Sequence, residues 1–143
     1  MRQVVRCFLQ DNDKILLVKH NENTLWTLPG GHVEDGESIF DAIEREIKEE
    51  FNLKIKLTND NKYLNYSHIK EFSKPLSIYT ISYNSPKHGV VTKLEYIFLA
   101  KVVSGELKVQ EEEIYDYKWF TRDEINNNSS HIYSQILDLL NLF

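Results

Sequence analysis

Three glutamates that could hold a metal ion lie close together in the first half of this 143-residue chain. Glu49 and Glu50 follow Glu46 by three and four positions, so on an α-helix the three share one edge, within an arc of roughly 100°. Like charges at this spacing repel by about 0.2–0.5 kcal/mol per pair. A divalent cation would remove the repulsion, and clustered carboxylates suit Mg²⁺ or Mn²⁺ better than Zn²⁺. A solvated acidic helix face is the alternative.

A helix that carries these glutamates also needs a face that packs. Ser38 and Asp41 form a capping pair, which predicts a helix from about residue 38 to residue 51. Apolar residues with helical spacing fall on the opposite arc: Phe40, Ile43, Ile47 and Phe51. One face of the predicted helix therefore packs, and the other is free to bind.

The spacing of the whole stretch resembles the signature of the Nudix hydrolases. That signature is a glycine, five residues, Glu, seven residues, Arg-Glu, an aliphatic residue, one residue, Glu-Glu, one residue, a glycine and an aliphatic residue. The matching residues are Gly31, Glu37, Arg45, Glu46, Ile47, Glu49, Glu50 and Leu53. Asn52 replaces the late glycine. Because Asn tolerates a left-handed backbone best after Gly, this departure concerns the helix end rather than the carboxylates.

The resemblance implies a metal site built on this stretch. Glu46, Glu49 and Glu50 are the expected ligands, with the carbonyl of Gly30 as a further oxygen ligand. The implied cofactor is Mg²⁺, with Mn²⁺ as a substitute. The number of metal ions stays open.

Further roles follow from the same resemblance. Arg45 is expected to orient the acidic residues, since a guanidinium can bridge two carboxylates, and Glu37 is its expected partner. Glu34, beside the glycine loop, either contacts metal or is solvated.

Many members of the family also use a Glu from a loop before a late strand with an aromatic end. Here the run 111–113 precedes residues 115–119, and Glu113 is the first choice for metal ligand or base, with Glu112 next. The expected catalytic set is Glu49, Glu50, Glu113 and Arg45. Which of them is the general base stays open.

The implied reaction is hydrolysis of a nucleoside diphosphate linked to another group, by attack of water on phosphorus. Members that cleave ADP-ribose often carry a proline at the position of Ile69, and members that cleave dinucleoside polyphosphates a tyrosine at Lys70. The long motif of the NADH-cleaving branch is absent. By elimination we expect a nucleoside triphosphate, including an oxidised one, to be cleaved to monophosphate and pyrophosphate. ADP-ribose hydrolysis is the alternative.

Two other classes of function compete with hydrolysis. A Nudix-like module could sense a nucleotide without cleaving it, and a structural or interaction domain is a third reading. The complete set of Arg45, Glu46, Glu49 and Glu50 argues against both, because neither needs to activate water.

Length and composition indicate the number of domains, the kind of partner and the location of the protein. A chain of this size fits one domain, and we predict a single Nudix domain over residues 1–143. The net charge of −5 lacks the basic footprint of a nucleic-acid binder, so the expected partner is a small nucleotide, bound by a monomer or homodimer. No apolar run reaches membrane-spanning length, and the N-terminus lacks a secretory pattern. With Cys7 as the only cysteine, expected to be buried, a cytoplasmic location follows.

The remaining pattern predicts an α/β fold, and the resemblance implies an α/β/α sandwich with a mixed β-sheet. Strands are predicted at residues 3–9, 14–19, 25–28, 54–57, 76–83, 93–103 and 115–120. Residues 58–61 and 84–89 are predicted as loop and turn, and residues 63–74 stay unassigned. A capping box at Thr121 and Glu124 begins a short helix, and a last helix follows Ser129 or Ser130.

Histidines and aromatic residues give weaker signals. His20, His32, His68, His88 and His131 show no paired metal spacing, so no chemistry is assigned to them. Trp26, Tyr63, Tyr66, Tyr79 and Tyr83 could stack on a base, but aromatic residues in strands usually belong to the core.

Overall fold

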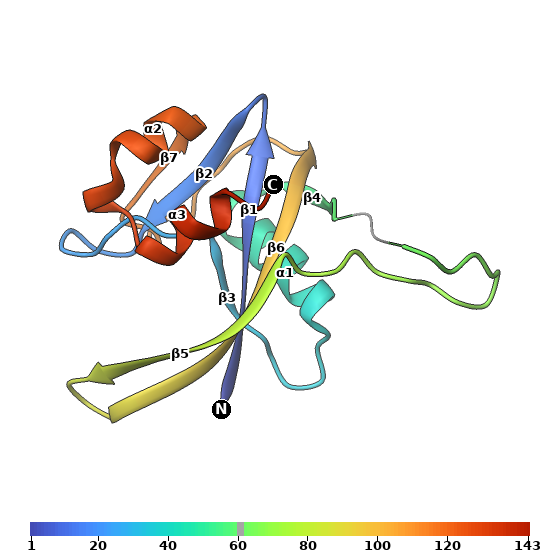
Figure 1. The fold of residues 1–143 in the computed structure, drawn as a ribbon, viewed down its shortest axis with the longest axis horizontal. Helices are drawn as coiled ribbons and strands as arrows, with labels where there is room; N and C mark the ends of the chain where they lie inside the picture. The colour runs from blue at the N-terminus through green and yellow to red at the C-terminus, as the bar shows by residue number, and fades with distance from the viewer. Residues whose placement is uncertain (60–61) are drawn as a thin grey trace.

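The fold is a mixed β-sheet with helices on both faces (Figure 1), seen in a computed structural model that describes residues 1–59 and 62–143. Its main path runs β4-β6-β1-β2-β7, with β3 paired to β1 and β5 paired to β6. The strands are β1 (Arg2–Asp11), β2 (Lys14–Lys19), β3 (Gly30–His32), β4 (Lys54–Leu57), β5 (Ser77–Ser85), β6 (Gly89–Ser104) and β7 (Asp116–Phe120). Only β1 and β6 pair in parallel among these strands of the described chain. The predicted α/β/α sandwich with a mixed sheet is confirmed.

β1 lies at the centre of the sheet and pairs with β2 through a tight hairpin. The two-residue turn Asn12-Asp13 has positive φ angles of 49° and 66°, the backbone that matches the twist of paired strands. Asn and Asp are the residues that tolerate this conformation best after Gly. The predicted antiparallel pair of strands is confirmed.

Side chains alternate along the central strands and divide the core in two. Val5, Cys7 and Leu9 face α1 (Ile39–Phe51). There they form one core cluster with Ile43, Ile47 and Phe51 of that helix. Phe8 faces the other way, into the cluster that includes Ile125 and Ile136 of the C-terminal helices. In Figure 1, α3 crosses in front of β1 and α1 lies behind the sheet. Cys7 is fully buried, as predicted, and burial raises the pKa of its thiol.

The C-terminal segment closes the second face. Thr121 and Glu124 form the predicted capping box at α2 (Arg122–Asn127), with both reciprocal hydrogen bonds present. A 3₁₀ turn, η1 (Ser129–His131), follows, and α3 runs only from Ser134 to Leu140. The predicted start of the last helix at Ser129 or Ser130 is therefore wrong.

Strand pairing explains that error and one other. Ile132 forms a parallel bridge with Trp26, which holds the chain extended just before α3. The segment 25–28, which was predicted to be a strand, is not one. Trp26 and Thr27 make isolated bridges only, and the strand begins at Gly30.

Two segments extend from the body of the sheet in Figure 1. One is the hairpin of β5 and β6, longer than predicted because Asn84 and Ser85 continue β5. The other comprises residues 62–75, which form neither helix nor strand. Of the predicted loop 58–61, residues 60 and 61 lie outside the described residues. None of the helices in the described parts of the chain is long and apolar enough to cross a membrane.

The approach of β3 to β1 gives the first prediction. Gly30 has φ +154°, and a Cβ built there would lie 1.9 Å from the carbonyl oxygen of Val5. Because that oxygen belongs to the backbone, it cannot move aside. Gly30→Ala should therefore lower the free energy of unfolding by more than about 4 kcal/mol in urea titrations. Gly89→Ala is the control, since a Cβ there meets nothing within 4 Å among the described residues. Its only cost is the strain of a side chain on a left-handed backbone, about 1–2 kcal/mol of unfolding free energy. Equal losses in the two variants would refute the prediction.

Candidate metal and nucleotide site

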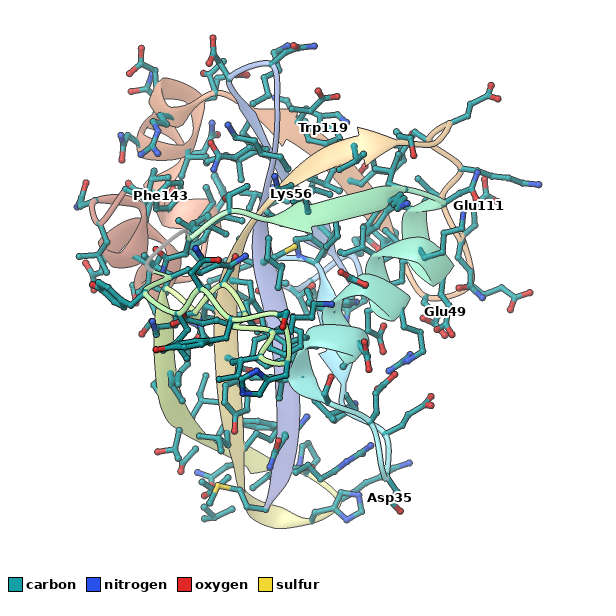
Figure 2. All side chains as sticks on the ribbon, turned by 90° about the vertical axis from the view of Figure 1, so that its right-hand side faces the viewer. Asp35, Glu49, Lys56, Glu111, Trp119 and Phe143 are labelled. Carbon is teal, nitrogen blue, oxygen red and sulfur yellow. The ribbon has the colours of Figure 1, made fainter. Side chains whose placement is uncertain are left out.

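Helix α1 carries three of the predicted ligands and is capped at both ends. Ser38 Oγ accepts a hydrogen bond from the Asp41 N–H at 3.0 Å, and Asn52 closes the helix in the left-handed conformation, φ 58° and ψ 32°. The helix matches its prediction, with Ser38 as the cap rather than the first helical residue. Figure 2 shows Glu49 on the outer side of α1.

The guanidinium of Arg45 lies at the centre of the acidic cluster. Its Nε and Nη2 donate to the two carboxylate oxygens of Glu37, at 2.7 and 3.0 Å. Its Nη1 donates to Glu46 Oε1 at 3.1 Å and to Glu49 Oε2 at 3.2 Å. Nη2 also donates to the carbonyl oxygen of His32 at 3.0 Å. The structure thus confirms the predicted pairing of Arg45 with Glu37 and places the guanidinium between the other carboxylates.

Partial burial strengthens this pairing. The side chains of Arg45 and Glu37 are only 21% and 15% exposed. The hydrogen bond from Arg45 holds the pKa of Glu37 below its ordinary value, and the same bond, with the charge of Glu46, raises the pKa of Arg45. Glu34 lies at the rim, 68% exposed and 3.7 Å from Arg45 Nη1. Its second predicted option, a solvated position, fits this exposure.

Gly31 leaves room for the carboxylate of Glu46. A Cβ built on Gly31 would lie 2.4–2.5 Å from the Cδ and both oxygens of Glu46. The two adjacent glycines therefore have different tasks. Gly30 lets β3 approach β1, and Gly31 lets a carboxylate of α1 lie against β3.

Glu50 is a buried carboxyl group that forms no ion pair among residues 1–59 and 62–143. Its residue is 3% exposed, and Oε2 has no hydrogen-bond partner among the described residues. Burial raises the pKa of Glu50 to about 9, helped by a hydrogen bond with Glu46 and by the negative charges of Glu46 and Glu113. Ionised Glu50 thus calls for a neighbouring positive charge.

The loop between β6 and β7 brings Glu113 towards this group. Glu113 is close enough to raise the pKa of Glu50, and its carbonyl oxygen lies 3.3 Å from His20 Nδ1. Glu111 and Glu112 instead border a separate shallow pocket with Lys108 and Tyr117. Figure 2 places Glu111 at the C-terminal end of α1, on the same side of the molecule as Glu49. These positions favour Glu113 over Glu112.

The chemistry of the donors fits a hard divalent cation. Glu46, Glu49, Glu50 and Glu113 offer only carboxylate oxygens, and the free oxygen of Glu50 is the kind of buried donor that a cation satisfies. Across residues 1–59 and 62–143, however, no three His, Cys, Asp or Glu side chains converge on one point as a metal cage would require. Arg45 holds Glu46 and Glu49 in their present positions, so a cation would have to draw them from it. The role of the Gly30 carbonyl stays a prediction.

A cavity of about 380 Å³ lies on the sheet face opposite α1. Its polar wall is a network in which Glu95 Oε1 accepts the Tyr79 hydroxyl at 2.9 Å and Glu95 Oε2 lies 3.5 Å from Arg6 Nε. Arg6 Nη1 also donates to the Leu28 carbonyl at 3.0 Å. The cavity is also lined by Tyr83, Lys93, Tyr133 and Gln135.

Sequence reasoning missed Arg6, Glu95, Lys93 and Gln135. A charged residue in the middle of an apolar strand was the available signal for Arg6 and Glu95. Of the aromatic candidates, Tyr79 and Tyr83 line the cavity. Trp26 packs edge-to-face on Phe120, with ring centroids 5.2 Å apart. Tyr63 and Tyr66 are exposed on the segment 62–75, away from both sites.

The ion pair of Glu37 gives the second prediction. Because the native pKa of Glu37 lies below its value in the unfolded chain, the ionised group stabilises the fold at neutral pH, and this stability is lost as pH falls through the native pKa. The free energy of unfolding of wild type should exceed that of Glu37→Gln by about 1–3 kcal/mol at pH 7. This difference should disappear below about pH 4. Urea titrations across pH measure it. Glu34→Gln, at the exposed rim, should change stability by under about 0.5 kcal/mol. A gap that is independent of pH would contradict the prediction.

The contact of Gly31 with Glu46 gives the third prediction. Gly31→Ala forces the Glu46 carboxylate to turn away, which costs little stability because the end of that side chain is flexible. We expect Mn²⁺ affinity, measured by calorimetry, to fall about 10- to 100-fold. Gly36→Ala in the same loop should bind Mn²⁺ like wild type, since its Cβ meets no atom within 4 Å in the described chain. Equal Mn²⁺ affinities in wild type and both variants would show that Gly31 does not contribute to metal binding.

Comparison with known proteins identifies the family of this chain. The NUDIX domain family matches residues 1–140. An uncharacterized Nudix hydrolase of Bacillus subtilis, YvcI, is 28% identical over 127 residues, which are 89% of this chain and 70% of that protein. The ADP-ribose pyrophosphatase of Methanocaldococcus jannaschii is 32% identical over 103 residues, 70% of this chain and 50% of that protein.

Solved structures share the fold as well. A hydrolase of the NUDIX family from Clostridium perfringens superposes with a TM-score of 0.71 and 26% identity, covering 98% of this chain and 96% of that one. The family's signature residues are also the ones that meet around Arg45 in this structure. This chain therefore belongs to the Nudix hydrolase family.

Proposed function

We propose that this protein is a Mg²⁺-dependent pyrophosphohydrolase that cleaves a nucleoside triphosphate, including an oxidised one, to monophosphate and pyrophosphate. The observation that carries the proposal is the buried carboxyl of Glu50, which has an oxygen without a partner in the described chain and lies beside Glu46 in a cluster organised by Arg45. A binding module that only senses nucleotides has no need for such a group.

The metal would be held by Glu46, Glu49, Glu50 and Glu113, with the Gly30 carbonyl as a further ligand. When bound, Mg²⁺ or Mn²⁺ screens the phosphate charge and acidifies the attacking water. Arg45 compensates the charges of Glu46 and Glu49 through hydrogen bonds of 3.1 and 3.2 Å. Glu37 keeps the guanidinium in place, so we assign it a structural role.

The chemical step needs a base as well as ligands. Water attacks phosphorus, one P–O bond of the anhydride breaks, and pyrophosphate leaves with the electron pair. A carboxylate that is not fully engaged by metal accepts the proton of the water. Glu50 and Glu113 are the candidates, because Glu50, once ionised beside the metal, has an oxygen without a partner among the described residues, and Glu113 lies on a loop beside it.

The cavity on the opposite sheet face supports a nucleoside as the bound group. Its tyrosines offer aromatic surface, and Glu95 and Gln135 offer hydrogen-bond acceptors and a donor. A volume of about 380 Å³ is near the lower end for ligand sites, which suits one nucleoside better than two. This size is the argument for a triphosphate over a dinucleotide.

ADP-ribose is the second candidate substrate. The relative from Methanocaldococcus jannaschii that carries this activity in its name is 32% identical over 103 residues. Against it stands Ile69 at the position where the resemblance expects a proline.

A nucleotide panel with and without Mg²⁺ tests the proposal. Wild type should release pyrophosphate from at least one nucleoside triphosphate, and chelation by EDTA should abolish the release. Glu50→Gln should lower kcat about 10²- to 10⁴-fold. Its stability in the absence of metal should stay close to that of wild type at pH 7, because the high pKa already keeps Glu50 neutral there.

Each other outcome identifies an alternative. Release of AMP and ribose phosphate from ADP-ribose alone would favour the second substrate. Nucleotide binding without cleavage of any member of the panel would favour a sensing module. Full activity in Glu50→Gln would refute the assignment of the site.

A further inference from the structure

The loop from Gly105 to Tyr115 is tied to the C-terminal end of α1. The Lys108 N–H donates to the Phe51 carbonyl at 3.0 Å, and the Gln110 N–H donates to the Glu50 carbonyl at 2.8 Å. Both carbonyls belong to the last turn of the helix, where they have no partner within the helix. The loop therefore satisfies the end of the helix that carries the glutamates.

Asn52 adds a third tie through its side chain. Its Nδ2 donates to the Glu106 carbonyl at 3.0 Å, and its Oδ1 accepts from Lys48 Nζ at 3.0 Å. The entry of the loop packs closely here, because a Cβ on Gly105 would lie 2.5 Å from the Asn52 carbonyl oxygen. A glycine at position 52, as in the family signature, could adopt the same backbone but could form neither side-chain bond.

The far end of the loop is also held. The Tyr115 N–H donates to the Lys19 carbonyl at 2.9 Å, and the buried Ile114 packs in the core beneath α1. Between these attachments a turn closed by the Glu113 N–H and the Gln110 carbonyl, 3.2 Å apart, carries the glutamates 111–113. The position of Glu113 is thus set by where the loop meets α1.

We infer that Asn52 is a positioning residue, whose side chain ties the loop at Glu106 to the end of α1 and so holds Glu113 beside Glu50. The inference rests on the proposed function, in which Glu113 serves the metal site. The inference explains the one departure from the family signature. Where the signature has a glycine, the side chain of Asn52 forms a hydrogen bond to the loop.

Asn52→Gly is the decisive variant, since it removes the side chain without straining the left-handed backbone. Loss of the hydrogen bond to Glu106 should speed hydrogen exchange at Lys108 and Gln110 about 3- to 10-fold, with the melting temperature nearly unchanged. Mn²⁺ affinity, measured by calorimetry, should fall by a similar factor. Lys48→Ala is the matched control. It removes the contact with Oδ1, leaves the tie to Glu106, and should match wild type in both measurements.

A double-mutant cycle decides whether the effect passes through Glu113. In a Glu113→Gln background, Asn52→Gly should cause no further loss of Mn²⁺ affinity. An equal further loss would overturn the inference, and so would faster exchange with unchanged Mn²⁺ affinity, which describes a purely structural tie. None of these measurements needs turnover. Inactivity on every nucleotide with an intact cycle would refute the proposed function alone, and an additive cycle in an active enzyme would refute this inference alone.

Discussion

The site depends on one electrostatic constraint, which is that several carboxylates must stay ionised within a few ångströms of each other. The guanidinium of Arg45 meets most of this need, because it donates to Glu37, Glu46 and Glu49 from a partly buried position. Its planar fork matches carboxylate geometry in a way that a lysine could not. Glu50 forms no ion pair with Arg45 in the described part of the chain, and burial raises the pKa of its carboxyl to about 9. Arg45 thus compensates the carboxylates around it, while the buried Glu50 is left without an ion pair in the described part of the chain.

Backbone features serve this constraint as much as side chains do. Gly30 allows β3 to lie against β1, and Gly31 allows the Glu46 carboxylate to lie against β3. The loop that carries Glu113 completes the last turn of α1 through the carbonyls of Glu50 and Phe51. The two glycines and the carbonyls at the end of α1 therefore hold the acidic side chains close together. Repulsion between the carboxylates alone would move them apart.

The sequence was informative where a local rule decides the structure and uninformative where pairing decides it. The capped helix with Ser38 and the hairpin turn at Asn12 follow from local propensities, and both were predicted. The acidic cluster was found because its spacing is local to one helix. The strand at 25–28 and the early last helix were wrong because Trp26 and Ile132 pair with each other across more than a hundred residues. The cavity was missed for the same reason, since its wall joins strands and a helix that are far apart in the chain.

Strand register also explains how an acidic chain could accept an anionic substrate. Lys93 pairs with Arg2, and Glu95 pairs with Val4, which in turn pairs with His32, so these side chains project from one sheet face. Burial lowers the pKa of His32, and the charges of Arg2, Lys93 and Arg6 lower it further, so the cations are close enough to act on one imidazole. The carboxylates lie on α1, across the sheet, and β3 runs between the two groups. A nucleotide seated in the cavity would meet the positive charges of Arg6 and Lys93, which line it. The net charge of −5 is therefore unevenly distributed, with Arg6 and Lys93 at the cavity and the acidic cluster on α1.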